Sequence, residues 1–157
     1  MKKNHKLPLS MVLSGGVLLI IILATLLATL SPYDPIAVET GQKFLPPSAQ
    51  HLLGTDNFGR DTFTRLLYGG RVSLLIGVAS TALSTVIAIV YGAISGIAGE
   101  KVDTLLMRFT EIILSIPNLL LVILLQAVLG KASIFSISFI IGITSWPGIA
   151  KVVRTEV

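Results

Sequence analysis

The sequence predicts an all-α membrane protein with about four transmembrane helices, an external loop and a short interfacial helix. Hydrophobic residues make up 53% of the 157 residues, charged residues only 13%, and the mean hydropathy is +0.88. A soluble domain carries roughly a quarter charged residues. Four stretches contain no Asp, Glu, Lys or Arg, and each reaches the roughly 18 residues that mark a candidate membrane span. They are residues 7–33, 72–99, 112–130 and 132–150.

The chain begins with a basic tail, residues 1–8, and a first predicted span, residues 9–30. The apolar run is longer than the 7–15 residues of a signal-peptide core, and no A-x-A-type cleavage site ends it. An uncleaved membrane anchor is therefore favoured over a secretory signal. By the positive-inside rule, Lys2, Lys3 and Lys6 place the N-terminus in the cytoplasm.

Threading the chain from that end places residues 31–71 outside and leaves residues 72–157 to form helices two to four. The first half of the outer segment is rich in proline, which predicts an extended loop. From Asp61 onward, Phe63, Leu66 and Leu67 recur at helical spacing among the polar residues Arg60, Thr64 and Arg65, which predicts a short amphipathic helix on the membrane surface. Thr55 or Asp56 is the predicted cap just before that helix.

The charge and cysteine content exclude several classes of protein. The net charge is +4 and the pI about 9.6, but basic residues are spread over the connectors and form no block interleaved with aromatics. Nucleic-acid binding is therefore not expected. The absence of cysteine excludes disulfides, thiolate metal sites and cysteine nucleophiles.

Asp56, Arg60 and Asp61 are the residues that most resemble a charged site. Two acids five residues apart are poor calcium ligands, since calcium takes six or more oxygens. An Asp–Arg network that fixes the loop is favoured over a metal site, and His51 is expected to be a loop residue rather than a ligand. The glycines nearby form no GxxxxGK[ST] phosphate-binding loop.

No enzymatic site is predicted. The chain has several serines but no GxSxG motif, and its only histidines, His5 and His51, are not placed to act as a base. Asp103 and Glu111 lack the motif contexts of an intramembrane protease. No metal or catalytic residues are therefore assigned.

Small residues recur at every fourth position of the second predicted span. Such a ridge lets helix backbones approach closely in lipid, where no hydrophobic drive brings helices together. Packing against other helices is favoured over a direct role in a substrate path. The ridge consists of Ser80, Ser84, Ala88, Gly92 and Gly96, and its last two members form a GxxxG motif.

A charged pair and a proline mark the entrance to the third span. Arg108 and Glu111 are three residues apart, so they share a helix face and can pair. Pro117 removes a helical hydrogen bond and predicts a kink. The kinked helix is either a gate or a simple adaptation to its neighbours, and both alternatives stay open.

Three stretches resemble one family, the C-type permease subunit of dipeptide, oligopeptide and nickel ABC importers. They are HLLGTDNFGRDTFTRLLYGGRVSL at 51–74, GEKVDTLLMRFTEIILSIPNLLL at 99–121 and ITSWPGIAKVVRTEV at 143–157. The first is the most specific, and Lys151 stands where the family usually has arginine. The motif residues of the first stretch are Gly54, Thr55, Asp56, Gly59, Arg60, Asp61, Arg65, Tyr68, Gly69 and Arg71.

The resemblance implies a multi-pass permease of the bacterial plasma (inner) membrane. Such a subunit pairs with a second, homologous permease subunit, and two cytoplasmic ATPase subunits drive it, so ATP is expected on those partners and no cofactor on this chain. An extracellular or periplasmic substrate-binding protein would deliver peptides, nickel or a metal chelate.

The resemblance also implies that the chain is an incomplete, truncated ABC importer permease. Family members continue into a cytoplasmic loop that docks on the ATPase and into two further helices, and this sequence ends at Val157, before that loop. Residues 72–157 would then be the start of the permease core. The alternative is a non-transporting membrane interaction protein, or an inactive relic, that associates with a full-length permease.

Overall fold

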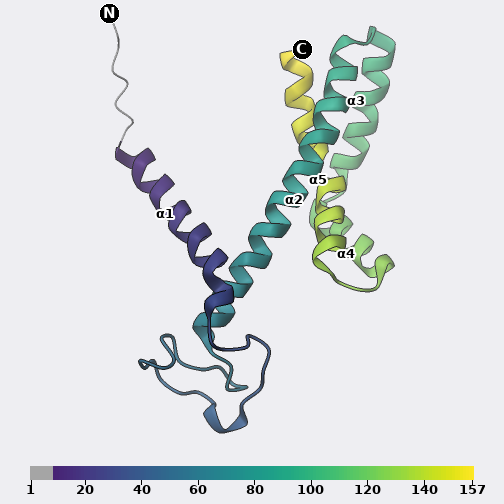
Figure 1. Ribbon diagram of the computed structural model, residues 1–157. Coiled ribbons are helices and arrows are strands. Elements are labelled where there is room, and N and C mark those ends of the chain that lie inside the picture. The colour runs from purple at the N-terminus through teal and green to yellow at the C-terminus, as the bar shows by residue number, and fades with distance from the viewer. Residues whose placement is uncertain (1–8) are drawn as a thin grey trace, which may run out of the picture. The chain divides into compact units, whose positions relative to one another are not determined.

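A computed structural model describes residues 9–157, and it confirms the all-α class. The predicted basic tail, residues 1–8, lies outside the described residues. Between residues 9 and 157 there is no β-strand, only an isolated antiparallel bridge between Thr55 and Asp61. The elements are α1 (Leu9–Leu26), η1 (Leu27–Leu30), η2 (Thr40–Gln42), α2 (Thr62–Ile97), α3 (Glu100–Ser115), α4 (Asn118–Leu129) and α5 (Ile134–Glu156) (Figure 1).

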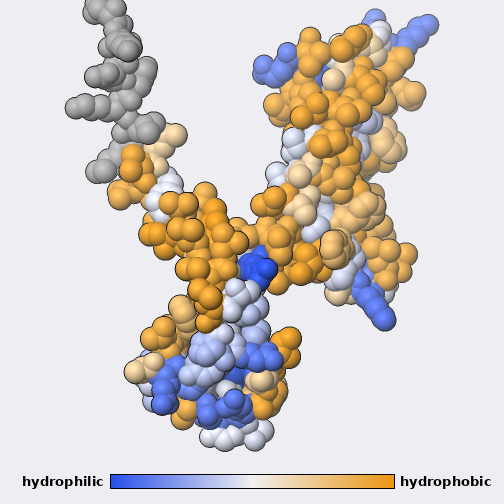
Figure 2. Space-filling view, in the orientation of Figure 1, coloured by the Kyte–Doolittle hydropathy of each residue, from blue (hydrophilic) through white to orange (hydrophobic). Residues whose placement is uncertain are grey.

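Three helical segments are long and apolar enough to cross a membrane, or four if the bent pair α3–α4 counts as one span. The three are Ser10–Leu30, Thr62–Ile97 and Ile134–Glu156. Hydrophobic residues cover the helices, whereas hydrophilic residues gather in the loop between α1 and α2 (Figure 2). This distribution is typical of helices that face lipid and of a loop that faces water.

The described residues form two compact units, one up to Leu74 and one from Leu75 onward, and α2 contributes to both. In the first unit, α1 approaches α2 closely where the two helices meet near the loop. A side chain at Gly70 would lie 2.6 Å from the methyl group of Thr25, so the two helices are in close contact there. Thr25 and Ala28 are buried, while most other residues of α1 are exposed apolar side chains suited to lipid.

The structure differs from the prediction of a separate interfacial helix. Residues after Thr62 continue without a break into the second span, so α2 is one helix of 36 residues. At 1.5 Å per residue it is about 54 Å long, well beyond the roughly 30 Å of a bilayer's hydrocarbon core. Gly69 and Gly70 lie inside this helix, and each costs it only about 1 kcal/mol, which a long helix tolerates.

In the second unit, α2 packs against α5 through small residues. Ala88, Trp146 and Ala150 form a buried cluster, and the rings of Tyr91 and Trp146 lie 4.5 Å apart between their centroids. A side chain at Gly92 would lie 2.6 Å from the carbonyl oxygen of Ala150. The two backbones therefore approach as closely as a glycine permits.

The third predicted span is broken rather than merely kinked. Helix α3 ends at Ser115, α4 begins at Asn118, and the two are bent by 82°. Proline excludes the helical conformation from the residue before it, and Ile116 is accordingly extended, with φ −90° and ψ 126°. The apolar stretch 112–130 is thus shared between two helices.

The last helix begins with a capping box at Ser133 and Ser136. It runs past the apolar stretch 132–150, so that Lys151 and Arg154 belong to the same helix. Pro147 lies inside α5 and is buried.

Candidate functional site

The loop between α1 and α2, residues 31–61, is folded on itself and held by backbone hydrogen bonds. The N–H of Glu39 donates to the carbonyl of Phe58 (3.0 Å), and the N–H of Thr55 donates to that of Leu45 (3.1 Å). Gly54 and Gly59 turn the chain with φ of 69° and 76°. A side chain at Gly59 would collide with the carbonyl of Glu39, so this motif glycine is required both by its φ and by its neighbour.

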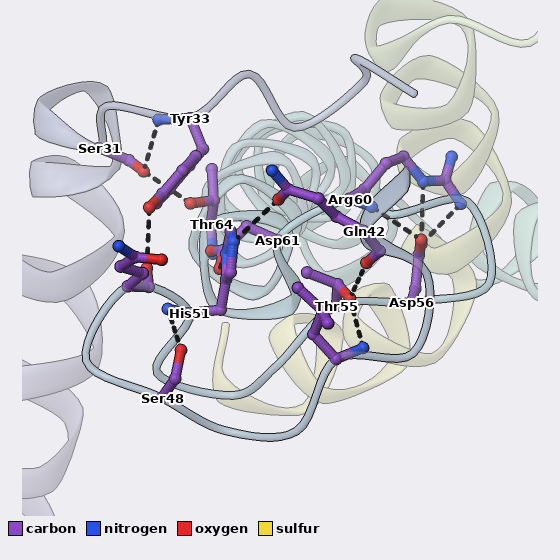
Figure 3. Close-up of polar contacts among 12 residues, drawn as sticks. Ser31, Tyr33, Gln42, Ser48, His51, Thr55, Asp56, Arg60, Asp61 and Thr64 are labelled. Atoms are coloured by element: carbon purple, nitrogen blue, oxygen red, sulfur yellow. Dashed lines mark hydrogen bonds and ion pairs between the residues drawn. The ribbon is translucent and has the colours of Figure 1, made fainter. Parts of the chain in front are cut away.

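The centre of the loop is a buried pair, His51 and Asp61 (Figure 3). One carboxylate oxygen of Asp61 lies 3.0 Å from Nδ1 of His51, and the other accepts the backbone N–H of Thr64 at 2.7 Å. Nε2 of His51 meets the amide oxygen of Gln42 at 3.1 Å. Asp61 therefore caps α2, in place of the predicted caps Thr55 and Asp56, because His51 holds its carboxylate beside the first turn.

The same pair connects the loop to both helices of the first unit. Thr64 in α2 shares a hydrogen bond of 2.6 Å with the hydroxyl of Ser31, which follows η1. Tyr33 stacks against His51, with 4.9 Å between ring centroids, and its hydroxyl donates to the carbonyl of Gln50 at 2.9 Å. We call Ser31, Tyr33, Gln42, His51, Asp61 and Thr64 the cap network.

Asp56 organises a second cluster at the edge of the loop, with Arg60 and Arg65. One oxygen of Asp56 accepts the backbone N–H groups of Phe58 (2.8 Å) and Arg60 (3.0 Å). The other accepts Nε of Arg60 at 2.9 Å and pairs with Arg65. The predicted Asp–Arg network thus consists of Asp56 and the two arginines, whereas Asp61 pairs with His51 because its side chain turns toward the cap network.

Both carboxylates are stabilised in their ionised form. Desolvation raises the pKa of Asp56, but hydrogen bonds from the side chain and backbone of Arg60 and from Phe58 outweigh it, so this pKa lies well below its usual range. Desolvation likewise opposes ionisation of Asp61, and hydrogen bonds from Thr64 and His51 lower its pKa overall. The two charges therefore stabilise the folded loop.

Among residues 9–157, no three His, Cys, Asp or Glu side chains converge as a metal site would require. The oxygens of Asp56 are occupied by N–H donors, and those of Asp61 by Thr64 and His51. The arrangement is suited to holding the loop in one conformation.

A largely apolar cavity of about 710 Å³ lies within the first unit, beside the cap network. Leu27 and Leu30 from the end of the first helical segment, Phe63 and Leu67 from α2, and Tyr33 from the loop line it. The loop therefore joins the helices through polar contacts on one side and leaves an apolar hollow on the other.

The remaining motif residues of the loop stretch lie on α2, outside both clusters. Tyr68 is half-buried, and Gly69 has open space where a side chain would be. Arg71 is exposed and makes no ion pair with a residue between 9 and 157. The structure thus brings only part of the motif together.

The predicted packing ridge lies on the face of α2 that approaches α5. Its buried members are Ser80, Ser84, Ala88 and Gly92. Gly96 is exposed, but a side chain there would lie 3.1 Å from the carbonyl of Arg154.

The three residues of the possible gate lie on two elements. Arg108 and Glu111 pair loosely, at 3.5 Å, on an exposed face of α3, and Pro117 stands at the break.

A third polar cluster, in the second unit, joins the ends of α2, α3 and α5. Arg154 donates through Nε to Asp103 at 2.5 Å and pairs with its second oxygen, and the hydroxyl of Ser95 donates to Asp103 at 2.5 Å. This cluster was not predicted, since 51 residues separate Asp103 from Arg154 and no pattern connects them. Nor were Ser31, Gln42 and Thr64 predicted, because they are polar residues without a motif of their own.

Comparison with known proteins decides the family. Residues 88–157 match the model of the binding-protein-dependent transport system inner membrane component. The chain is 37% identical to the dipeptide transport system permease protein DppC of Bacillus subtilis over 140 residues, which are 89% of this chain and 43% of that protein. The chain belongs to this permease family. Membership confirms the resemblance, and it also confirms that the chain is not an enzyme, because the family consists of transport components.

Two further permeases of peptide transport systems show the same extent of similarity. The oligopeptide permease OppC of Bacillus subtilis is 40% identical over 144 residues, covering 89% of this chain and 47% of that protein. The probable D,D-dipeptide permease DdpC of Escherichia coli is 38% identical over 141 residues, covering 87% and 47%. The chain spans less than half the length of these relatives. As a family member with several candidate spans, it is a multi-pass inner membrane component.

Proposed function

We propose that the chain is a permease component of an ATP-driven, binding-protein-dependent importer of peptides. The observation that carries this proposal is the identity of 37–40% with dipeptide and oligopeptide permeases over 89% of the chain. The relatives reported above are named for peptide transport, which favours peptides over nickel or a metal chelate. The absence of a metal-binding cluster between residues 9 and 157 agrees with that choice.

The proposed partners follow from what the chain itself supplies. Its 157 residues contain no GxxxxGK[ST] motif, and we assign ATP binding to separate cytoplasmic ATPase subunits, as the family resemblance implies. Helices α3 and α4 expose large apolar side chains, among them Leu105, Leu119 and Val128 at 71–76%. Lipid and a second, homologous permease subunit are the partners that such faces accept in a membrane.

The orientation is proposed from the basic tail, which places the N-terminus in the cytoplasm and the 31–61 loop outside. A substrate-binding protein would then meet this loop. The loop is suited to that contact because its hydrogen bonds hold it in one conformation, while Ile36 and Phe44 remain 77% and 73% exposed on it. A fixed apolar contact loses little conformational entropy when a partner binds.

The experiment is an uptake assay in the source bacterium, with the gene deleted and then restored in its native genomic context. This design retains whatever the gene encodes beyond residue 157. Deletion is expected to abolish uptake of a labelled dipeptide or tripeptide and to leave nickel accumulation unchanged, and restoration is expected to return peptide uptake. Unchanged peptide uptake would contradict the proposal and favour a non-transporting interaction protein. Loss of nickel accumulation instead would contradict the peptide assignment.

A further inference from the structure

One polar side chain in the apolar helix α4 has no partner. The sequence of α4 is NLLLVILLQAVL, and Gln126 is its only polar residue after the first position. Both the amide nitrogen and the amide oxygen of Gln126 are buried, and neither forms a hydrogen bond with any residue between 9 and 157. A buried amide that has lost its hydrogen bonds to water and has formed no others destabilises a fold. Inside a membrane, such a polar group marks a functional position.

Gln126 borders a cavity between α4 and α5. The cavity measures about 320 Å³, and its other walls are Val122, Ile123, Ile137 and Ile140. This volume lies at the lower end of the range of small-ligand sites, roughly 300–1,000 Å³. The surface of the cavity is apolar and both amide atoms are buried, so the amide reaches this space only by rotation about the side-chain torsions of Gln126.

The break between α3 and α4 is a second, independent observation. Ser115, Ile116 and Pro117 are exposed, and the helix that starts after them has no side-chain cap. Non-helical backbone at membrane depth is tolerated only against protein or beside a water-filled cavity. In transporters, broken helices lie beside the substrate path. The break and the unpartnered amide belong to the same bent pair, and both need a polar environment.

We propose that the α4–α5 cavity is a water-accessible contact site for the transported peptide, at which the Gln126 amide hydrogen-bonds to a peptide bond. This inference rests on the proposed function and adds to it a residue that touches the substrate. A glutamine amide offers one acceptor oxygen and a donor NH₂ group, the complement of the C=O and N–H of a peptide bond. The apolar walls accept side chains of varied sequence. A metal ion would instead need charged ligands, and the cavity wall has none.

Cysteine accessibility tests the contact with water. Residues 1–157 contain no cysteine, so a single introduced thiol is the only one that a thiol reagent can modify within them. Gln126→Cys and Val122→Cys, each in the native membrane, place a thiol in the cavity. Leu124→Cys is the matched control, two residues from Gln126 on α4, 63% exposed and not part of the cavity wall. The probe is a small, charged, membrane-impermeant methanethiosulfonate reagent, which reacts with the thiolate and so requires water.

Gln126→Cys and Val122→Cys are expected to react at least about tenfold faster than Leu124→Cys, and a transported tripeptide is expected to slow the reaction. Equal, slow reaction at all three positions would overturn the inference. Fast reaction that the tripeptide does not slow would overturn the peptide contact. Disulfide cross-linking of Gln126→Cys to another subunit would also overturn it, because the amide would then pair across a subunit interface.

Uptake kinetics provide the second measurement. Gln126→Leu keeps a similar volume and removes both amide atoms, and it is expected to raise the half-saturating peptide concentration by about threefold to tenfold. Leu124→Ala is expected to leave it unchanged. If Gln126→Leu also leaves it unchanged, the amide does not contact the peptide and the inference fails. If the unsubstituted gene fails to restore any uptake, the proposed function fails instead, while the reaction rate at residue 126 still decides whether water enters the cavity.

Discussion

The 31–61 loop and the α2–α5 contact of the second unit both bury side chains, but the loop buries polar ones and the helix contact buries small ones. The loop buries charged and polar groups such as His51 and Asp61 and satisfies each with a specific partner. The α2–α5 contact buries almost no charge and depends on small side chains such as Ala88 and Gly92. Chemical identity therefore matters in the loop, whereas size matters in the helices.

The largest effect on stability is expected when a large side chain is placed at the close contact between α2 and α5. Gly92→Leu forces a large side chain against the carbonyl of Ala150 and should destabilise the α2–α5 contact by about 3 kcal/mol or more. The fluorescence emission of Trp146 measures it, because Trp146 is the one tryptophan of the 157 residues and its ring packs 4.5 Å from that of Tyr91 across the contact. The emission spectrum is expected to shift with Gly92→Leu.

Gly77→Leu is the control for that substitution, because Gly77 lies in α2 with open space around it. The emission of Trp146 should match that of the parent in this variant. Parent-like emission with Gly92→Leu as well would show that size does not govern this contact.

The second-largest effect on stability is expected from adding a single methyl group in the loop. Gly59→Ala places a side chain at a φ of 76° against the carbonyl of Glu39 and should cost the loop about 2–3 kcal/mol. Faster tryptic cleavage after Lys43 measures the loss. Gly41→Ala, in the same loop with open space, should cleave at the parent rate. Equal rates for both variants would refute the requirement for glycine at position 59.

Removing the cap of α2 should cost about 1–2 kcal/mol. Asp61→Ala deletes the acceptor of the Thr64 N–H and leaves His51 buried without its carboxylate. Hydrogen exchange of residues 39–64 is expected to accelerate. Asp34→Ala is the control, since Asp34 is exposed and accepts only a local N–H from Ile36. Similar exchange in the two variants would contradict the role of the cap network.

The loop should also lose part of its stability in acid. The pKa values of Asp56 and Asp61 are lowered in the folded chain, so their contribution is fully present above the unfolded value, near 4, and declines as pH falls through the folded values. Hydrogen exchange of the loop, corrected for the intrinsic rate, is therefore expected to rise below about pH 4. The double variant Asp56→Ala, Asp61→Ala should show a flatter dependence, and an unchanged dependence would show that other groups cause it.

The smallest effect is expected from the exposed ion pair of α3. Arg108 and Glu111 are 3.5 Å apart with exposed side chains, and such surface pairs contribute about 0–1 kcal/mol. Arg108→Ala should leave the emission of Trp146 unchanged. A shift like that of Gly92→Leu would show that the exposed ion pair contributes to helix packing.

Composition and charge-free runs were sufficient to predict the fold class, because a membrane span must be long and apolar whatever its neighbours. The position of the helix break could also be anticipated, since Pro117 constrains the residue before it. The continuity of α2 could not, because two adjacent glycines are compatible both with a boundary and with a long helix.

The details of the polar clusters depend on residues that are distant in the sequence. Thr55, Asp56 and Asp61 are all acceptable helix caps, and the choice falls on Asp61 because His51 folds back beside it. Gln126 escaped notice because one polar residue does not interrupt an apolar run. Its missing partner becomes visible only when α4 is packed against α5.

The shortness of α4 has a consequence for the biogenesis of the chain. Twelve residues of helix rise about 18 Å, roughly half of what a bilayer core requires, so α4 cannot be recognised by the translocon as an independent span. Helix α3 can add only its apolar last residues, since burying charges such as Asp103 and Arg108 opposes insertion. A turn of a few residues at Gly130 joins α4 to α5, and the two helices pack together. We therefore expect them to enter the bilayer as a helical hairpin, with α5 supplying the hydrophobic driving force.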